Sequence, residues 1–207
     1  MTTVSEPATA ADLDLLYSPP SEMIVKGVLP RLLPFHRAYL EVASFFCLAT
    51  GSAAGLDASP RGGPAGFVQA LDDQRVAFAD WPGNNRIASL RNLAEDDRVG
   101  MLFLFPGLEV FMRINGRAAI STDAALLDRL AEKGKPPKCA IVVTLDEVLF
   151  HCGKAINRAR LWDDGARLDR AMVPSPGQMK AALTGADEAA ARQLDEGYLK
   201  SVRNDLY

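Results

Sequence analysis

Short apolar runs, separated by clusters of Gly, Pro, Asn and Asp, fill the middle of the chain. Apolar runs of this kind, bounded by turn residues, are typical of β-strands, and short turns between them indicate hairpins. The pattern predicts about seven or eight short strands. They are expected over residues 43–50, 56–60, 67–71, 75–79, 99–105, 108–120, 139–145 and 148–152.

Two of these strands carry further expectations. Pro60 has no backbone N–H, so the second strand is expected to bulge or stop there. Along 108–120, Arg113, Asn115 and Arg117 alternate with apolar residues, which predicts a solvated outer face. Hairpin connections with only short helices between strands favour an antiparallel barrel or sandwich over an alternating parallel α/β domain. A barrel also leaves no free strand edges.

Helical spacing is confined to short stretches and to the C-terminal tail. A small helix is expected to start at Thr122 or Asp123, because either side chain can cap it, and to run through Leu130. The other helices are expected over residues 23–33, 35–43 and 178–203.

The stretch over residues 80–86 lies between two strand-like segments and organises the rest of the chain. Pro82 and Gly83 mark a turn. Asn84 or Asn85 is placed to cap a helix, because an amide oxygen accepts hydrogen bonds from the free N–H groups of the first turn. The sequence therefore predicts a turn that leads directly into a capped helix.

That helix is expected to bury Ile87, Leu90 and either Leu93 or Ala94 on one face. Its N-terminus presents backbone N–H groups, two Asn amides and the guanidinium of Arg86. A helix N-terminus carries about half a positive charge and suits a phosphate. The alternative is an ordinary capped helix with a solvated Arg86, and the spacing alone leaves both open.

Composition narrows the function classes. The 207 residues are 48% hydrophobic and 24% charged, with a formal net charge of −3, so nothing indicates the basic stripe that nucleic-acid binding needs. The first residues show no charged segment followed by an apolar one, and the longest apolar run, 99–105, is too short to span a bilayer. We expect a cytoplasmic protein with no membrane partner.

Cysteine and histidine usage predicts neither a disulfide framework nor a metal site. The three cysteines form no C-x-x-C pair. His151 and Cys152 are adjacent, and adjacent strand side chains point to opposite faces, so the two are not expected to bind one metal ion.

Familiar catalytic and nucleotide motifs are absent: the chain has no G-x-S-x-G, no G-x-x-x-x-G-K-[ST] and no G-x-G-x-x-G. What remains is a set of groups suited to phosphate, with two flat aromatic partners. Such a set, without a nucleophile or metal, fits a protein that binds an anionic cofactor carrying its own chemistry; the alternative is solvated basic residues. The set comprises Arg61, Asn84, Asn85, Arg86, Lys154, Arg158 and Arg160, with Trp81 and Trp162.

Six segments in order resemble the FMN-binding split-barrel proteins related to pyridoxamine 5′-phosphate oxidase, and the resemblance runs from about residue 35 to 163. The segments are Ser44–Thr50, Asp57–Gly62, Asp80–Asn92, Arg98–Phe103, Arg113–Ala118 and Phe150–Ala155. The resemblance implies a mainly β (α+β) fold, a six-stranded antiparallel split β-barrel with short flanking helices. It also implies a homodimer with FMN in a cleft between the subunits.

Domain organisation and site residues follow from the same resemblance. We expect a flexible tail over 1–20, the FMN-binding domain over 21–165, and a helical extension over 166–207 that packs on the barrel or the dimer partner. Arg86 and Asn85 are implied to meet the flavin phosphate. The other implied cofactor contacts are Asn84 and Ser89 at the helix start; Ser59, Pro60 and Arg61 beside the ring or ribityl chain; Lys154 and Arg160 as supplementary charges; and Trp162 as a shield for the flavin.

The implied function is that of an FMN-dependent oxidoreductase acting on a small molecule, in which the flavin passes hydride or electrons. No catalytic side chain is assigned. Arg160–Asp163 matches the Arg-Leu-His-Asp run of true pyridoxamine 5′-phosphate oxidases only in part, so a vitamin B6 substrate is not supported. One alternative is a flavin or haem carrier or sensor without turnover. Another is the same barrel with a deazaflavin, or with no cofactor as an interaction protein.

Overall fold

The protein is described here by a computed structural model over residues 7–206. Its strands are β1 (Phe45–Ser52), β2 (Gly55–Gly62), β3 (Gln69–Ala70), β4 (Arg75–Asp80), β5 (Arg98–Leu104), β6 (Val110–Ser121) and β7 (Cys139–Cys152). Its α-helices are α1 (Ala10–Leu16), α2 (Glu22–Lys26), α3 (Pro34–Val42), α4 (Ala88–Glu95), α5 (Ala124–Arg129), α6 (Lys154–Ala159), α7 (Pro176–Thr184) and α8 (Glu188–Asn204). Two 3₁₀ turns span Asp164–Ala166 and Arg170–Met172. Among these described helices, none has the length and apolar character to cross a membrane.

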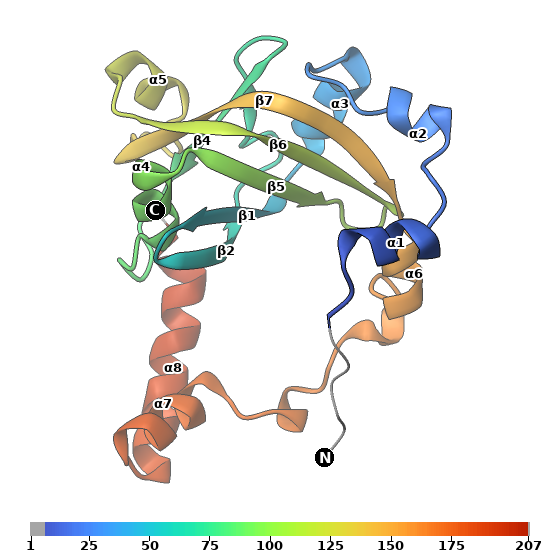
Figure 1. Cartoon of the computed structure of the whole chain (residues 1–207). Helices are drawn as coiled ribbons and strands as arrows, with labels where there is room; N and C mark the ends of the chain where they lie inside the picture. The colour runs from blue at the N-terminus through green and yellow to red at the C-terminus, as the bar shows by residue number, and fades with distance from the viewer. Residues whose placement is uncertain (1–6, 207) are drawn as a thin grey trace.

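The strands form one antiparallel sheet in the order β2-β1-β5-β6-β7-β4-β3. The sheet curves strongly, and short helices lie around it (Figure 1). This is the expected split β-barrel, with β2 and β3 as its edges. The expected strand number of six is one too low, because the two residues of β3 add a short seventh strand beside β4.

The last two expected strands are one continuous strand, β7. Asn115 pairs with Glu147 and the next residue, Gly116, pairs with Leu145, so Asp146 is an extra residue on β7. This is a β-bulge, and it shifts the alternation of inward side chains by one position. The sequence reads as two strands because the acidic residues Asp146 and Glu147 at this bulge separate two apolar runs.

The expectation for Pro60 is wrong. β2 neither bulges nor stops there: Pro60 pairs opposite Cys47, and the regular register with β1 continues to Gly62. Because β2 is an edge strand, its outer side makes no hydrogen bonds to another strand, and a residue without a backbone N–H is tolerated there.

Large apolar side chains from opposite sides of the curved sheet meet in one core. Phe46 lies at its centre, with its ring centroid 5.0 Å from those of both Phe78 and Phe103. All three side chains are fully buried, as are Met112 and Ile114. Burial of each such side chain contributes roughly 1.5–3 kcal/mol, so this core is a main source of the stability of the barrel.

The C-terminal extension is a pair of helices rather than the single helix expected. Gly185 ends α7 in the left-handed conformation, with φ of 69°, and α8 returns alongside. Asp195 on α8 accepts hydrogen bonds from Ser175 Oγ and Gly177 N at the start of α7. The pair projects from the barrel (Figure 1). Its docking on the barrel or a partner stays a prediction, as does flexibility of the N-terminal tail, of which residues 1–6 lie outside the described chain.

Candidate cofactor cleft

A cleft of about 370 Å³ is lined by one face of β2, the end of β4, the start of β7 and the N-terminal end of α4. Small-molecule sites in proteins typically have volumes of about 300–1,000 Å³. The lining residues are Asp57, Ala58, Ser59, Arg61, Asp80, Trp81, Pro82, Gly83, Asn84, Asn85, Arg86, Ile87, Ala88, Ser89, Leu90, Lys138 and Cys139.

The β2 wall is polar because every second residue of a strand shares a face. Asp57, Ser59 and Arg61 are the half-buried residues of this strand, and they alternate with exposed ones. Asp57 Oδ2 accepts hydrogen bonds from Ser59 Oγ at 2.8 Å and from Ser89 Oγ at 2.6 Å. Arg61 Nη2 donates to Ser89 Oγ at 3.0 Å. Ser89 therefore links α4 to the edge strand.

Arg61 has an unused hydrogen-bond donor. Its Nη1 donates to the Pro60 carbonyl oxygen at 3.1 Å, but its buried Nε has no partner in the structure. A buried donor without an acceptor costs roughly 1–3 kcal/mol. Arg61 lines the cleft, so a turn of its side chain would bring this donor to a ligand oxygen and remove the cost, which fits an anionic, oxygen-rich ligand.

The turn before α4 does not form the expected cap. Asn84 Oδ1 accepts from the backbone N–H of Arg86 at 3.0 Å, so this amide closes the turn and is not available to the helix. Asn85 and Ile87 take left-handed conformations, with φ of 58° and 46°, and the helix begins only at Ala88. Neither asparagine caps α4, and its first-turn N–H groups have no side-chain cap.

The helix face also differs from expectation. Ile87 precedes the helix and is 47% exposed, whereas Ser89 and Leu93 are the buried positions and Leu90 packs against the core. A β-branched residue at positive φ is strained. Strain of this kind persists only where the surrounding structure holds it, and two residues further on Ser89 bonds to Asp57 and Arg61.

The cleft mixes both signs of charge. Three cations, Arg61, Arg86 and Lys138, face two carboxylates, Asp57 and Asp80. The hydrogen bond from Ser89 lowers the pKa of Asp57, and the bond from Ser59 and the charge of Arg61 act in the same direction. Burial raises the pKa of Asp80 despite the nearby Arg61 and Lys138. The excess of positive charge favours an anionic ligand.

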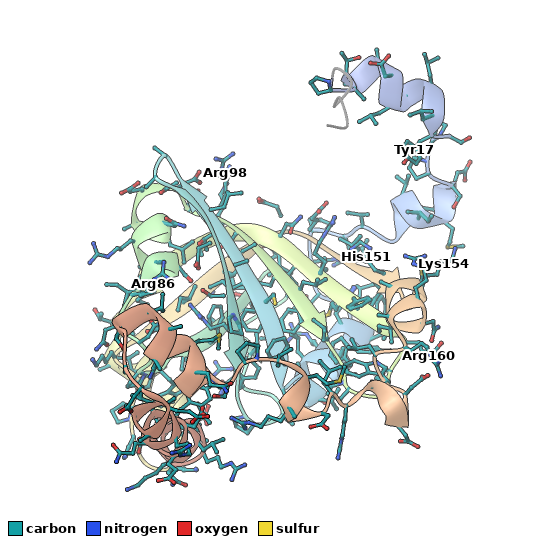
Figure 2. All side chains as sticks on the ribbon, turned by 90° about the horizontal axis from the view of Figure 1, so that it is seen from below. Tyr17, Arg86, Arg98, His151, Lys154 and Arg160 are labelled. Atoms are coloured by element: carbon teal, nitrogen blue, oxygen red, sulfur yellow. The ribbon has the colours of Figure 1, made fainter. Side chains whose placement is uncertain are left out.

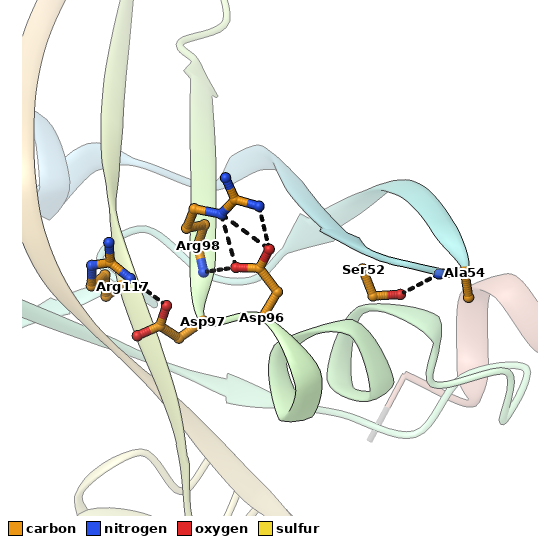
Figure 3. Close-up of polar contacts among 6 residues, drawn as sticks. All are labelled: Ser52, Ala54, Asp96, Asp97, Arg98 and Arg117. Atoms are coloured by element: carbon orange, nitrogen blue, oxygen red, sulfur yellow. Dashed lines mark hydrogen bonds and ion pairs between the residues drawn. The ribbon is translucent and has the colours of Figure 1, made fainter.

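Ion pairs fix the other end of α4, where β5 begins. Asp96 pairs with Arg98, and Asp97 pairs with Arg117 at 2.7 Å (Figure 3). The hydrogen bonds from the Arg98 side chain lower the pKa of Asp96 to about 2. These contacts join the turn between α4 and β5 to the start of β5 and to β6.

The structure gathers six of the ten expected contact residues around this cleft. They are Ser59, Arg61, Asn84, Asn85, Arg86 and Ser89. Pro60 lies between two of them on β2 and contributes its carbonyl oxygen to Arg61.

The remaining three lie elsewhere in the same chain. Figure 2 shows Lys154 and Arg160 on the opposite side of the barrel from Arg86. Arg160 pairs with Asp163 at 2.7 Å, and Trp162 Nε1 donates to the Leu108 carbonyl oxygen at 2.9 Å. Their contact with a cofactor therefore stays a prediction that needs a second subunit.

Sequence reasoning did not assign four polar residues of the cleft to the site. Asp57 was detectable, because it shares the strand face of Ser59 and Arg61. Asp80 was placed at the start of the 80–86 stretch without a role in the site, and it ends β4. Lys138 and Cys139 come from the start of β7, and no local pattern connects them with residues 57–61. Within residues 7–206, no three His, Cys, Asp or Glu side chains are grouped to hold a metal ion.

A comparison with protein families now adds to this geometry. The family model described as pyridoxamine 5′-phosphate oxidase matches residues 32–152, which is more than half of the chain. The chain belongs to this family. The resemblance expected from the six sequence segments is thereby confirmed, and the matched region contains β1 to β7 and the whole cleft.

Solved structures show similarity in fold only. HupZ of Group A Streptococcus is 17% identical, with a TM-score of 0.45 over 56% of this chain and 92% of that one. An FMN-binding protein from Syntrophomonas wolfei is 15% identical, with a TM-score of 0.43 over 55% and 82%. General stress protein 26 from Bacillus anthracis is 12% identical, with a TM-score of 0.44 over 55% and 88%. No curated protein matches the chain.

Proposed function

We propose that the protein binds FMN in this cleft and acts as an FMN-dependent oxidoreductase. Membership of the pyridoxamine 5′-phosphate oxidase family supports the cofactor class. The observation that carries the proposal is the buried, unpartnered Nε of Arg61 in a cleft with a surplus of cations. When bound, FMN supplies hydride and electron transfer at its ring, and the protein supplies binding and orientation.

The chain offers distinct surfaces for the charged and uncharged parts of such a cofactor. Arg86, Asn85 and the uncapped N–H groups of α4 form the anion-binding end. Trp81 offers a half-buried flat surface at the end of β4. Arg61 on β2 bonds to Ser89 of α4 and adds a further cation there. We assign the phosphate to the Arg86 end because a cation and uncapped helix N–H groups lie there.

A second copy of the chain completes the site in this proposal. Lys154 and Arg160 lie across the barrel from Arg86, and Trp162 follows Arg160 by two residues, so in this proposal the three reach the cofactor from another subunit. The homodimer with a shared cleft, expected from the family, gives these residues that role. A mixing experiment tests it directly.

Subunits carrying Arg86→Ala and subunits carrying Trp162→Ala should each bind FMN weakly. Mixed and allowed to exchange, they form heterodimers in which one cleft combines an intact Arg86 with an intact Trp162. Partial recovery of FMN binding on mixing supports the shared cleft. Normal binding by Trp162→Ala alone, or no recovery on mixing in subunits shown to exchange, contradicts it.

The absorbance spectrum of freshly purified protein tests the cofactor. Flavin bands that bleach with a reductant are expected. Reduction by a nicotinamide donor, and reoxidation by an acceptor faster than free flavin, support the oxidoreductase. A reducible flavin without such turnover favours the carrier or sensor alternative, and a haem or deazaflavin spectrum refutes the FMN assignment.

The substrate is proposed only as a small molecule, and a vitamin B6 substrate is not proposed. A cytoplasmic location, expected from the sequence, stays a prediction. Fractionation of cells that express the protein tests it.

A further inference from the structure

The hydrogen atoms of the Asp57 network can be assigned individually. Each serine hydroxyl has one hydrogen to donate. Ser59 and Ser89 both donate theirs to Asp57 Oδ2, at 2.8 and 2.6 Å. Arg61 Nη2 in turn uses one lone pair of Ser89. Neither hydroxyl therefore has a hydrogen left for a ligand.

Asp57 and Ser59 consequently present acceptors to the cleft, beside the donors of Arg61. Ionised Asp57 donates nothing and has lone pairs on Oδ1, and Ser59 Oγ keeps its lone pairs. The hydrogen bond from Ser89 lowers the pKa of Asp57, so the carboxylate stays ionised at neutral pH. Ligand hydroxyl groups, which are donors, match such a wall, whereas a phosphate dianion meets a like charge there.

We propose that Asp57 and Ser59 bind the hydroxyl groups of the cofactor's polyol chain, so that this chain, and not the phosphate, lies directly against Asp57. This inference rests on the proposed flavin binding. Asp57 acts in it as a specificity-determining residue: its charge strengthens hydrogen bonds from hydroxyl donors and weakens phosphate binding.

A purely structural role for Asp57 makes a different prediction. If the carboxylate only ties α4 to β2, its replacement weakens every ligand equally, whatever substituents the ring carries. Three flavins separate the roles. Lumiflavin has the ring alone, riboflavin adds the polyol chain, and FMN adds the phosphate.

The test measures dissociation constants of these three ligands by flavin fluorescence, for the full chain stripped of cofactor. Asp57→Asn keeps the shape but removes the charge. Asp146→Asn is the matched control, because Asp146 is exposed on β7 and does not line the cleft. In Asp57→Asn, the preference for riboflavin over lumiflavin should fall about tenfold, the scale of a lost hydrogen bond to a charged group. The preference for FMN over riboflavin should rise.

Asp146→Asn should keep both preferences of the wild-type chain. An unchanged riboflavin preference in Asp57→Asn overturns the inference, and so does an equal loss for all three ligands. If the wild-type chain binds none of the three, the proposed function fails and the inference fails with it. The wild-type titrations therefore distinguish the two failures.

Discussion

The imidazole of His36 lies parallel to the ring of Phe150, with centroids 5.3 Å apart and 4° between the planes. His36 Nδ1 also accepts a hydrogen bond from the backbone N–H of Leu33 at 2.9 Å, and its side chain is only 1% exposed. The ring thus joins the start of α3 to the end of β7 as a neutral group. A charged imidazolium cannot accept that hydrogen bond.

This burial makes stability depend on pH. Burial lowers the pKa of His36 below its usual 6.5. The neutral form is favoured in the folded protein, so the stabilisation is present above pH 6.5 and is lost as pH falls through the folded pKa. Urea unfolding between about pH 5 and 7.5 measures this loss. The His36→Gln protein should be less stable at pH 7.5 and should show a shallower decline on acidification. Equal declines in both proteins would contradict a titrating His36.

The burial of Asp80 predicts a pH dependence of stability opposite to that of His36. Burial raises its pKa above 3.8, so the protonated form is favoured in the fold. Its contribution is fully present below pH 3.8 and is lost as pH rises through the folded pKa. Asp80→Asn, which stays neutral, should therefore gain stability relative to wild type as pH rises from 3.5 to 7. Urea midpoints at matched pH values measure the gap. A gap that stays constant with pH removes Asp80 as the cause.

The strands were predictable from sequence because alternation and turn residues are local signals. The start of α4 was not predictable, because the Asn84 side chain had two possible hydrogen-bond donors. It accepts from the backbone N–H of Arg86 in the turn and not from an N–H of the helix. The continuity of β7 was hidden by one bulged residue, Asp146. Lys138 joins Asp57 in the cleft only through the curvature of the whole sheet, which no local pattern encodes.

Close packing at the β6–β7 bulge gives a third prediction. A Cβ added at Gly116 would fall inside contact distance of the Thr144 carbonyl oxygen, which is backbone and cannot turn aside. Gly116→Ala should lower the free energy of unfolding by about 1–3 kcal/mol, the usual cost of overpacking. Gly165→Ala is the control, because nothing lies within 4 Å of its added Cβ. Urea unfolding compares them, and equal stability of the two variants would show that the bulge can relax.

The anion-binding end of the cleft gives the last prediction. Arg86→Ala should weaken FMN binding by about 1.5–3 kcal/mol, on the order of ten- to a hundredfold in the dissociation constant, because a charge-assisted hydrogen bond to phosphate is lost. Riboflavin, which lacks the phosphate, should lose little. Arg91→Ala is the matched control: Arg91 is exposed on the same helix, α4, and does not line the cleft.

Fluorescence titration of both ligands against both variants resolves what Arg86 contacts. A loss confined to FMN and to Arg86→Ala places the phosphate at this end. If riboflavin weakens as much as FMN, Arg86 acts on the ring or polyol chain. If Arg91→Ala weakens FMN binding as much as Arg86→Ala does, the loss comes from removing a positive charge near α4 and not from a direct contact. Only one of the two side chains can make a given hydrogen bond to the phosphate.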